Sequence, residues 1–294
     1  MDVPANLKSS LTEKLAALCG KTVSITQCTP LQGRDINDSF RLDTTEGNYF
    51  LKINDAAKYP GLFAAEAKGL EMLGAAGAVP VPQPLAFGGN GEQQYLLTTF
   101  LKRELPAARD FWVDFGRGLA ALHRHSAARF GLDSDNYIGT LVQQNTPADT
   151  WSGFYRRHRL EPLIRALYDR GVLEKSWLSR ADYLYERLSA VFPEAPPSLL
   201  HGDLWSGNFM VGPGGKACLY DPAVYYGHRE MDLAMTRLFG GFDRRFYSAY
   251  EEAWPLEEGW QERVCLCQLY PLLVHALLFG GSYISEIKDI LKMY

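Results

Sequence analysis

One polar turn carries residue types that could transfer a proton and hold a cation. The stretch LLHGDLWSGNFM (199–210) sets Asp203 and Asn208 between two apolar flanks. A carboxylate in such a turn could accept the proton of an attacking hydroxyl. The amide oxygen of Asn208, five residues later, could face the same volume. One acid beside a turn is ordinary, so the chemistry depends on what else the chain supplies.

A second carboxylate follows a short β-rich run. In KACLYDPAVYYGHREMDLAM, Asp221 comes thirteen residues after Asn208. An amide oxygen and a carboxylate are hard oxygen donors, which suit a magnesium ion that also binds phosphate oxygens. Alone, the Asp221-Pro222 pair is equally typical of a turn.

A lysine and a glutamate upstream could complete a phosphate site. In NYFLKIN, a strand puts Leu51 and Ile53 on one face and Phe50 and Lys52 on the other. A lysine in such an apolar strand needs an anionic partner, unless it lies on an edge strand and reaches water. Glu66 lies fourteen residues later, within a predicted helix. A strand lysine paired with a helix glutamate can hold the α and β phosphates of a nucleotide, although Glu66 alone would usually be a solvated helix charge.

The elements that must position these residues divide the chain near residue 101. Residues 1–101 are predicted to be mostly strand with one helix. Three β-rich runs lie within 22–54, a helix covers 60–73, and two strands flank a glycine turn within 79–101. Amphipathic helices dominate after residue 101. In the exception, 198–220, SLLH and NFMV are predicted to be a strand pair that carries the Asp203–Asn208 turn as a hairpin loop.

This order of elements predicts an α+β, bilobal, protein-kinase-like fold. We expect residues 1–101 to form a small, β-rich, ATP-binding lobe. Residues 102–294 would form a larger, mainly helical lobe for catalysis and substrate binding. The cleft would lie at the joint, as ligand sites often do.

Composition narrows the classes of protein. The chain has 294 residues, is 47% hydrophobic, and carries a net charge of −4. That charge argues against a nucleic-acid binder that neutralises phosphates. We expect no membrane span, since LYPLLVHALLFGG is short and broken by glycine. The start of the chain lacks a signal-like apolar run, and five scattered cysteines suit reduced thiols. A cytoplasmic protein is therefore expected.

Two motifs resemble those of the fructosamine kinases, also called ketosamine-3-kinases, a branch of the aminoglycoside-phosphotransferase-like kinases. The motifs are HGDLWSGN and DPAVYYGHREMDLAMTRLFGGF. The resemblance extends over nearly the whole chain, including FGLDSDNYIGTLVQQNTPADTWSGFYRRHRLEPLI and LYPLLVHALLFGGSY. The pattern HGD-x-x-x-x-N is shared by many small-molecule kinases. The tryptophan form, together with YYGHRE and LFGGF, is much more specific.

The resemblance implies a role for each candidate residue. Asp203 would be the catalytic base, Asn208 and Asp221 the magnesium ligands, and Lys52 a phosphate contact oriented by Glu66. Gly33 would lie in the phosphate-covering loop, and Thr98, Thr99, Phe100 and Leu101 would form the adenine hinge. His201 and Asp232 would be structural, with Asp232 bracing the catalytic loop.

Two further residues concern the substrate. An indole at Trp205 could stack on the sugar, which we favour over a packing role. Glu230 could meet the substrate amine or pair with nearby arginine, and the sequence leaves both open. Two departures from the family pattern are the single glycine of LQGRDIND and Thr99 where relatives often have glutamate.

The implied activity is ATP- and Mg²⁺-dependent phosphorylation of a sugar hydroxyl, the 3-hydroxyl, on a ketosamine. Fructosamine and ribulosamine adducts of amines or proteins are the expected substrates, and repair of glycation is the expected role. Two alternatives remain. One is a kinase of the same fold acting on an aminoglycoside or choline-like metabolite, and the other is a nucleotide-binding pseudokinase.

Overall fold

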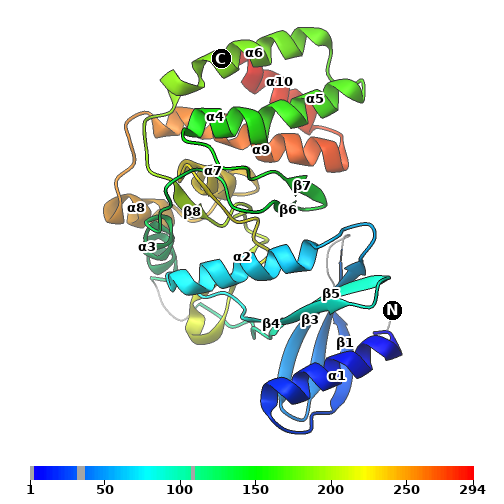
Figure 1. Ribbon diagram of the computed structural model, residues 1–294. Coiled ribbons are helices and arrows are strands. Elements are labelled where there is room, and N and C mark those ends of the chain that lie inside the picture. The colour runs from blue at the N-terminus through cyan, green and yellow to red at the C-terminus, as the bar shows by residue number, and fades with distance from the viewer. Residues whose placement is uncertain (1–2, 32–36, 107–109) are drawn as a thin grey trace.

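The computed structural model describes residues 3–31, 37–106 and 110–294. Figure 1 shows a smaller, sheet-containing part below a larger, mainly helical part. The smaller part consists of α1 (Ala5–Cys19), β1 (Ile25–Leu31), β2 (Asp38–Thr44), β3 (Gly47–Asp55), α2 (Leu62–Ala76), β4 (Pro84–Gly89) and β5 (Gln93–Thr99). Its strands form an antiparallel sheet in the order β1-β2-β3-β5-β4.

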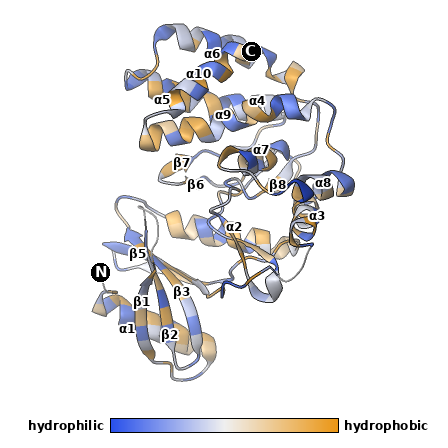
Figure 2. Cartoon of the chain, turned by 180° about the vertical axis from the view of Figure 1, so that it is seen from behind, coloured by the Kyte–Doolittle hydropathy of each residue, from blue (hydrophilic) through white to orange (hydrophobic). Residues whose placement is uncertain are grey.

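The sheet lies between two helices because its apolar residues alternate. Leu51 and Ile53 of β3 join the cluster that contains the buried side of α1. On the opposite face, Leu96 of β5 packs with Phe63 and other residues of α2. Figure 2 shows bands of hydrophilic and hydrophobic colour that alternate along the strands. Lys52 therefore lies on the α2 face of a central strand, as the alternation in NYFLKIN predicts.

Helix α1 corrects the prediction of a single helix in the first hundred residues. Leu7, Leu11 and Leu15 recur every fourth residue and are all buried against the sheet. This spacing is typical of an amphipathic helix and was available in the sequence.

The larger part contains most of the helices. Its elements are α3 (Phe111–His123), β6 (Asn136–Ile138), β7 (Leu141–Gln143), α4 (Trp151–Tyr155), a π-helical turn η1 (Arg156–Leu160), α5 (Glu161–Asp169), α6 (Lys175–Val191), β8 (Ser198–Leu200), β9 (Phe209–Val211), a 3-10 turn η2 (Pro213–Gly215), β10 (Ala217–Leu219), β11 (Tyr225–Gly227), α7 (Glu230–Leu238), α8 (Arg244–Ala253), α9 (Trp260–Phe279) and α10 (Tyr283–Met293). The sheet thus ends at Thr99 and the first helix of the larger part begins at Phe111. A lobe boundary at residue 101 stays our proposal.

The expected hairpin around the catalytic-looking turn is wrong. Strand β8 pairs with β11, and β9 pairs with β10. The turn 201–208 therefore connects two separate ribbons. Because β8 is paired with the strand that follows residue 224, residues 201–208 lie beside residues 220–224. The N–H of Ala223 donates to the carbonyl of His201 at 2.9 Å, and that of Tyr220 donates to the carbonyl of Asn208 at 3.1 Å.

Helix α9 continues the apolar stretch near the end of the chain back from Leu269 to Trp260. Within the described ranges, α9 is the one helix that is long and apolar enough, by length and composition, to cross a membrane. It packs against α5, α7 and α10, and 61% of its apolar window is buried. A core helix of a globular protein can have the same length and hydropathy as a membrane span, and the burial of α9 is that of a core helix.

Candidate active site

Lys52 joins both parts of the molecule. Its side chain is 6% exposed, and its Nζ donates to Glu66 Oε1 at 2.7 Å and to Asp221 Oδ1 at 2.5 Å. Burial disfavours the ammonium charge, but the two carboxylates outweigh it and raise the pKa of Lys52 above its usual value. The lysine therefore stays charged, and it links β3, α2 and the segment after β10.

Asp221 has an unusual backbone conformation. Its φ is 55°, which makes it the one residue other than glycine with positive φ in the described ranges. Aspartate tolerates this left-handed region better than most side chains. One carboxylate oxygen accepts from Lys52 while the side chain remains 45% exposed. Asp221 can therefore still reach a cation in the cleft.

Asp203 and Asn208 are held together within the turn. Asn208 is buried, and its Nδ2 donates to both the carbonyl and Oδ2 of Asp203 at 2.8 Å. This fixes the amide so that its oxygen faces away from Asp203. An amide oxygen at Asn208 and a carboxylate at Asp221 are the donor types that Mg²⁺ takes alongside phosphate oxygens. The donor set therefore fits the expected cation.

The backbone before Asp203 is braced from α7. Asp232 Oδ2 accepts the N–H of His201 at 2.8 Å, and Oδ1 accepts the N–H of Gly202 at 2.9 Å. Burial alone would raise the pKa of Asp232, but its hydrogen bonds and the neighbouring histidines lower it. Gly202 has φ +83°, and an added Cβ would lie 2.0 Å from the carbonyl oxygen of Ala223. Only glycine fits this position.

The expected structural roles of His201 and Asp232 are confirmed. His201 is fully buried, which lowers its pKa, and its Nε2 lies 3.0 Å from the carbonyl oxygen of Tyr220. Sequence reasoning missed His123, whose Nε2 lies 3.2 Å from Asp232 and whose Nδ1 lies 2.9 Å from the Tyr250 hydroxyl. A lone histidine at the end of α3 gives no signal for a partner 109 residues away.

Trp205 lies at one end of a row of aromatic side chains. We call this row, which consists of Trp205, Phe239, His275, Phe279 and Tyr283, the aromatic wall. The ring of Trp205 meets Phe239 edge-on at 5.6 Å, and Phe239 lies 4.8 Å from His275. His275 also contacts Phe279 and Tyr283. Phe279 is 61% exposed, so the wall is partly open to solvent. The sequence analysis missed these four residues, although two Phe-Gly-Gly runs, 239–241 and 279–281, were visible in the sequence.

Glu230 is not available to a substrate amine. It is 3% exposed, and its two oxygens accept from Arg263 Nη2 at 2.6 Å and Nε at 2.9 Å. This bidentate pair uses both carboxylate oxygens of Glu230 and the Nε and Nη2 edge of the Arg263 guanidinium. Of the two readings left open, the structure therefore supports pairing with arginine, but the partner is Arg263 in α9 and not a neighbour in sequence.

The expected hinge residues follow the end of β5. Thr98 is 2% exposed. The N–H of Thr99 donates to the carbonyl of Gln83 at 3.0 Å, and its Oγ1 accepts the N–H of Gln83 at 2.9 Å. The side chain of Thr99 thus helps to fix the residue that leads into β4. Phe100 lies under the Arg41 guanidinium at 5.4 Å. Leu101 follows without regular structure, and Gly33 lies outside the described residues.

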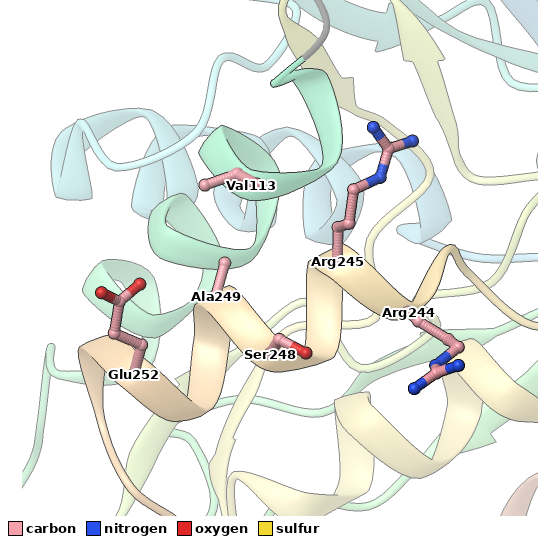
Figure 3. A pocket seen from close by; sticks show the side chains of 6 residues that line it. All are labelled: Val113, Arg244, Arg245, Ser248, Ala249 and Glu252. Carbon is pink, nitrogen blue, oxygen red and sulfur yellow. The ribbon is translucent and has the colours of Figure 1, made fainter.

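A hollow of about 570 Å³ between α3 and α8 lies outside this site (Figure 3). It is lined by Val113, Arg244, Arg245, Ser248, Ala249 and Glu252. None of these six belongs to the candidate set. The two arginines point in different directions (Figure 3), so the hollow has no convergent charge.

Comparisons with known proteins find relatives over nearly the whole chain. The family model described as "Fructosamine kinase" matches residues 7–294. A protein of Enterococcus faecium named as a probable ketoamine kinase is 40% identical over 271 residues, which are 90% of this chain and 94% of that protein.

Solved structures give the same answer for the fold. The "putative fructosamine-3-kinase" of Thermobifida fusca superposes with a TM-score of 0.85 at 35% identity, covering 96% of this chain and 97% of that one. Aminoglycoside phosphotransferase APH(4)-Ia, solved with ADP and hygromycin B, has a TM-score of 0.61 at 15% identity, covering 96% and 98%. The predicted bilobal, protein-kinase-like fold is confirmed.

Proposed function

Because the chain belongs to the fructosamine kinase family, we propose that it transfers the γ-phosphoryl group of ATP to a sugar hydroxyl, the 3-hydroxyl, of a ketosamine. The observation that carries the proposal is the ion-pair triad of Lys52 with Glu66 and Asp221. A charged, buried lysine that connects the sheet, α2 and a cation-binding carboxylate is the arrangement that phosphoryl transfer needs.

The reaction uses residues of the turn and of the segment after β10. The sugar hydroxyl oxygen forms a bond to the γ-phosphorus, the bond from that phosphorus to the β,γ-bridging oxygen breaks, and ADP leaves. Asp203 takes the hydroxyl proton. Asn208 and Asp221 would hold Mg²⁺, which neutralises phosphate charge when bound. Lys52 contacts the phosphates, and Glu66 keeps its ammonium in place.

The adenine lies against the backbone of residues 99–101 in this proposal, with Thr98 at the start of the hinge. Trp205 supports the sugar through its C–H groups. Phe239 and His275 continue that support through edge-on and tilted ring contacts, which hold the aromatic side chains in place. A wall that is partly exposed leaves room for the amine side of the adduct.

The physiological role that follows is repair of glycation in the cytoplasm. A phosphate on the 3-hydroxyl makes the sugar adduct unstable, so the amine is released. Fructosamine and ribulosamine adducts of lysine, free or in proteins, are the substrates we propose. An aminoglycoside or choline-like acceptor is the second candidate, favoured only by the shared fold of APH(4)-Ia.

The proposal is tested by Mg²⁺-dependent ADP release with ribuloselysine and fructoselysine. We expect turnover in the wild type and a loss of at least about a hundredfold in Asp203→Asn, since removing a base costs about 10²–10⁴-fold in rate. Nucleotide affinity should change little in this variant. Absence of turnover on both adducts, with nucleotide still bound, would refute the ketosamine assignment, and a panel of small metabolites would then test the second candidate.

A further inference from the structure

Three buried amide side chains lie outside the chemistry proposed above. Asn136, Gln143 and Asn145 are 7%, 2% and 0% exposed, and they come from the ribbon β6–β7 and the residues after it. Burying an amide without hydrogen bonds is costly. Three buried amides in one place therefore require mutual partners. We refer to these three residues as the amide cluster.

The hydrogen bonds of the amide cluster interlock. Asn136 Oδ1 accepts from Gln143 Nε2 and from Asn145 Nδ2, both at 2.8 Å. The Tyr270 hydroxyl donates to Gln143 Oε1 at 2.7 Å. These bonds fix which side of each amide carries the oxygen and which the nitrogen. If one amide were rotated by 180°, its NH2 group would meet another hydrogen-bond donor. The cluster has one orientation.

A buried arginine secures the cluster from behind. Arg159 Nη2 donates to Asn145 Oδ1 at 2.7 Å, and its Nη1 donates to the carbonyl of Gln144 at 2.5 Å. In the part of the chain that the structure describes, Arg159 has no carboxylate partner. The rings of Tyr225, Phe154 and Tyr270 lie 4.1, 4.6 and 5.2 Å from its guanidinium carbon, where they stabilise the cation. Arg159 lies on the π-helical turn η1, a feature often found near functional sites.

The cluster delivers two hydrogen bonds to the segment that carries Asp221. Gln143 Nε2 donates to the carbonyl of Ala223 at 3.0 Å, and Asn136 Nδ2 donates to that of Val224 at 2.7 Å. These carbonyls belong to the second and third residues after Asp221. A positive φ at a residue other than glycine persists only where its surroundings hold it. The amide cluster supplies such support.

The other side of the same ribbon holds α2. The Tyr137 hydroxyl donates to the carbonyl of Pro60 at 2.9 Å, and Lys68 Nζ donates to Ser134 Oγ at 2.9 Å. Gly69 of α2 approaches the Asp221 segment so closely that an added Cβ would lie 3.2 Å from Val224. Figure 1 shows α2 between the sheet and β6–β7. One ribbon thus contacts both the helix of Glu66 and the backbone after Asp221.

Resting on the proposed function, we infer that the amide cluster and Arg159 are positioning residues for the Asp221 carboxylate. They touch neither substrate nor nucleotide. They act through the carbonyls of Ala223 and Val224, which fix the backbone from which Asp221 reaches the cation of a bound nucleotide. The stretch DNYIGTLVQQN would then owe its composition to this task.

The test measures nucleotide binding and needs no turnover. Calorimetric titration of the full-length protein with AMP-PNP, with and without Mg²⁺, gives the ratio of the two dissociation constants. In Gln143→Met we expect this ratio to fall about tenfold, equivalent to about 1.4 kcal/mol, the scale of one or two lost hydrogen bonds. Affinity without Mg²⁺ should stay within about twofold, since the adenine and Lys52 contacts are kept.

A milder variant and a control separate positioning from stability. Tyr270→Phe removes only the donor that orients Gln143, so the ratio should fall by about threefold, and this variant decides the matter if Gln143→Met does not fold. Ile164→Val shortens a core side chain of α5 that is 1% exposed. It should lower the melting temperature and leave the ratio unchanged.

The outcomes separate two failures. If Gln143→Met and Tyr270→Phe keep the wild-type ratio while melting earlier, the amide cluster serves stability alone and the inference is overturned. If the wild type itself shows no Mg²⁺ enhancement, the proposed function fails and the inference fails with it. A reduced ratio in both variants, set against an unchanged one in Ile164→Val, supports the positioning role.

Discussion

The buried pair of Glu230 and Arg263 gives the sharpest test of how the substrate side is assigned. Glu230 is 3% and Arg263 7% exposed, and two hydrogen bonds of 2.6 and 2.9 Å join them. Glu230→Leu strands a buried guanidinium, and Arg263→Met strands a buried carboxylate. Either single change should lower the free energy of unfolding by about 3–5 kcal/mol. That loss is a large share of the free energy of unfolding of a typical domain, which is roughly 5–15 kcal/mol.

The double variant Glu230→Leu/Arg263→Met should regain most of this loss. Neither charge is then left unpaired, and replacing a buried ion pair with apolar side chains is often close to neutral. The remaining partners of Arg263 are the carbonyls of Glu257 and Glu258, which belong to exposed residues and can bind water. Urea unfolding of the four proteins gives the coupling energy, expected at about 5–9 kcal/mol if each single change costs about 3–5 kcal/mol and the double change about 1 kcal/mol.

Turnover in the same four proteins separates the structural role from a substrate contact. If Glu230 only pairs with Arg263, the double variant should keep the wild-type KM for the ketosamine within about twofold. A KM raised tenfold or more in a double variant of wild-type stability would refute the reasoning. The carboxylate would then have to reach the substrate amine.

Two further predictions concern acid stability and the aromatic wall. Burial lowers the pKa of His228 to about 3, helped by the charges of Arg263 and Arg229. Below about pH 6.5 the unfolded chain therefore binds a proton at this histidine, whereas the folded chain keeps it neutral. The free energy of unfolding should therefore fall as pH drops from about 6.5 toward 3, by up to about 1.4 kcal/mol per pH unit from this group. In urea unfolding between pH 7.5 and 5, His228→Phe should show a smaller dependence of that free energy on pH than the wild type. An equal dependence in the two proteins would contradict the role of His228. Trp205→Ala should raise the KM for the ketosamine about tenfold, whereas Trp205→Phe should keep a KM close to that of the wild type. ADP release measures the KM of both variants. An unchanged KM in the alanine variant would show that Trp205 is a packing residue.

Local patterns in the sequence predicted what depends on a single element. Alternation in NYFLKIN put Lys52 opposite Leu51, and the structure places it so because β3 is a central strand. Apolar residues recurring at three- and four-residue steps in α2 predicted that helix and with it the position of Glu66. The same kind of evidence existed for α1 and was overlooked.

Contacts between distant segments were beyond such patterns. Periodicity reports that a face is buried but does not say against which partner. The pairing of β8 with β11 instead of a local hairpin, and the choice of Arg263 as the partner of Glu230, depend on the whole topology. His123 was invisible for the same reason, since its two partners lie 109 and 127 residues away. The fold and the family could be predicted from motifs, whereas the contacts that support the candidate site could not.

The attachment of α2 has a consequence for regulation. Many kinases are switched off by moving the helix that bears the glutamate away from the lysine. Here such a movement would break the bonds from Tyr137 and Lys68 and open the close packing of Gly69. Helix α2 is poorly suited to such a switch, because it is bonded to the larger part of the molecule, from which it would have to move away. A switch that displaces α2 would therefore have to break these contacts as well as the Lys52–Glu66 ion pair.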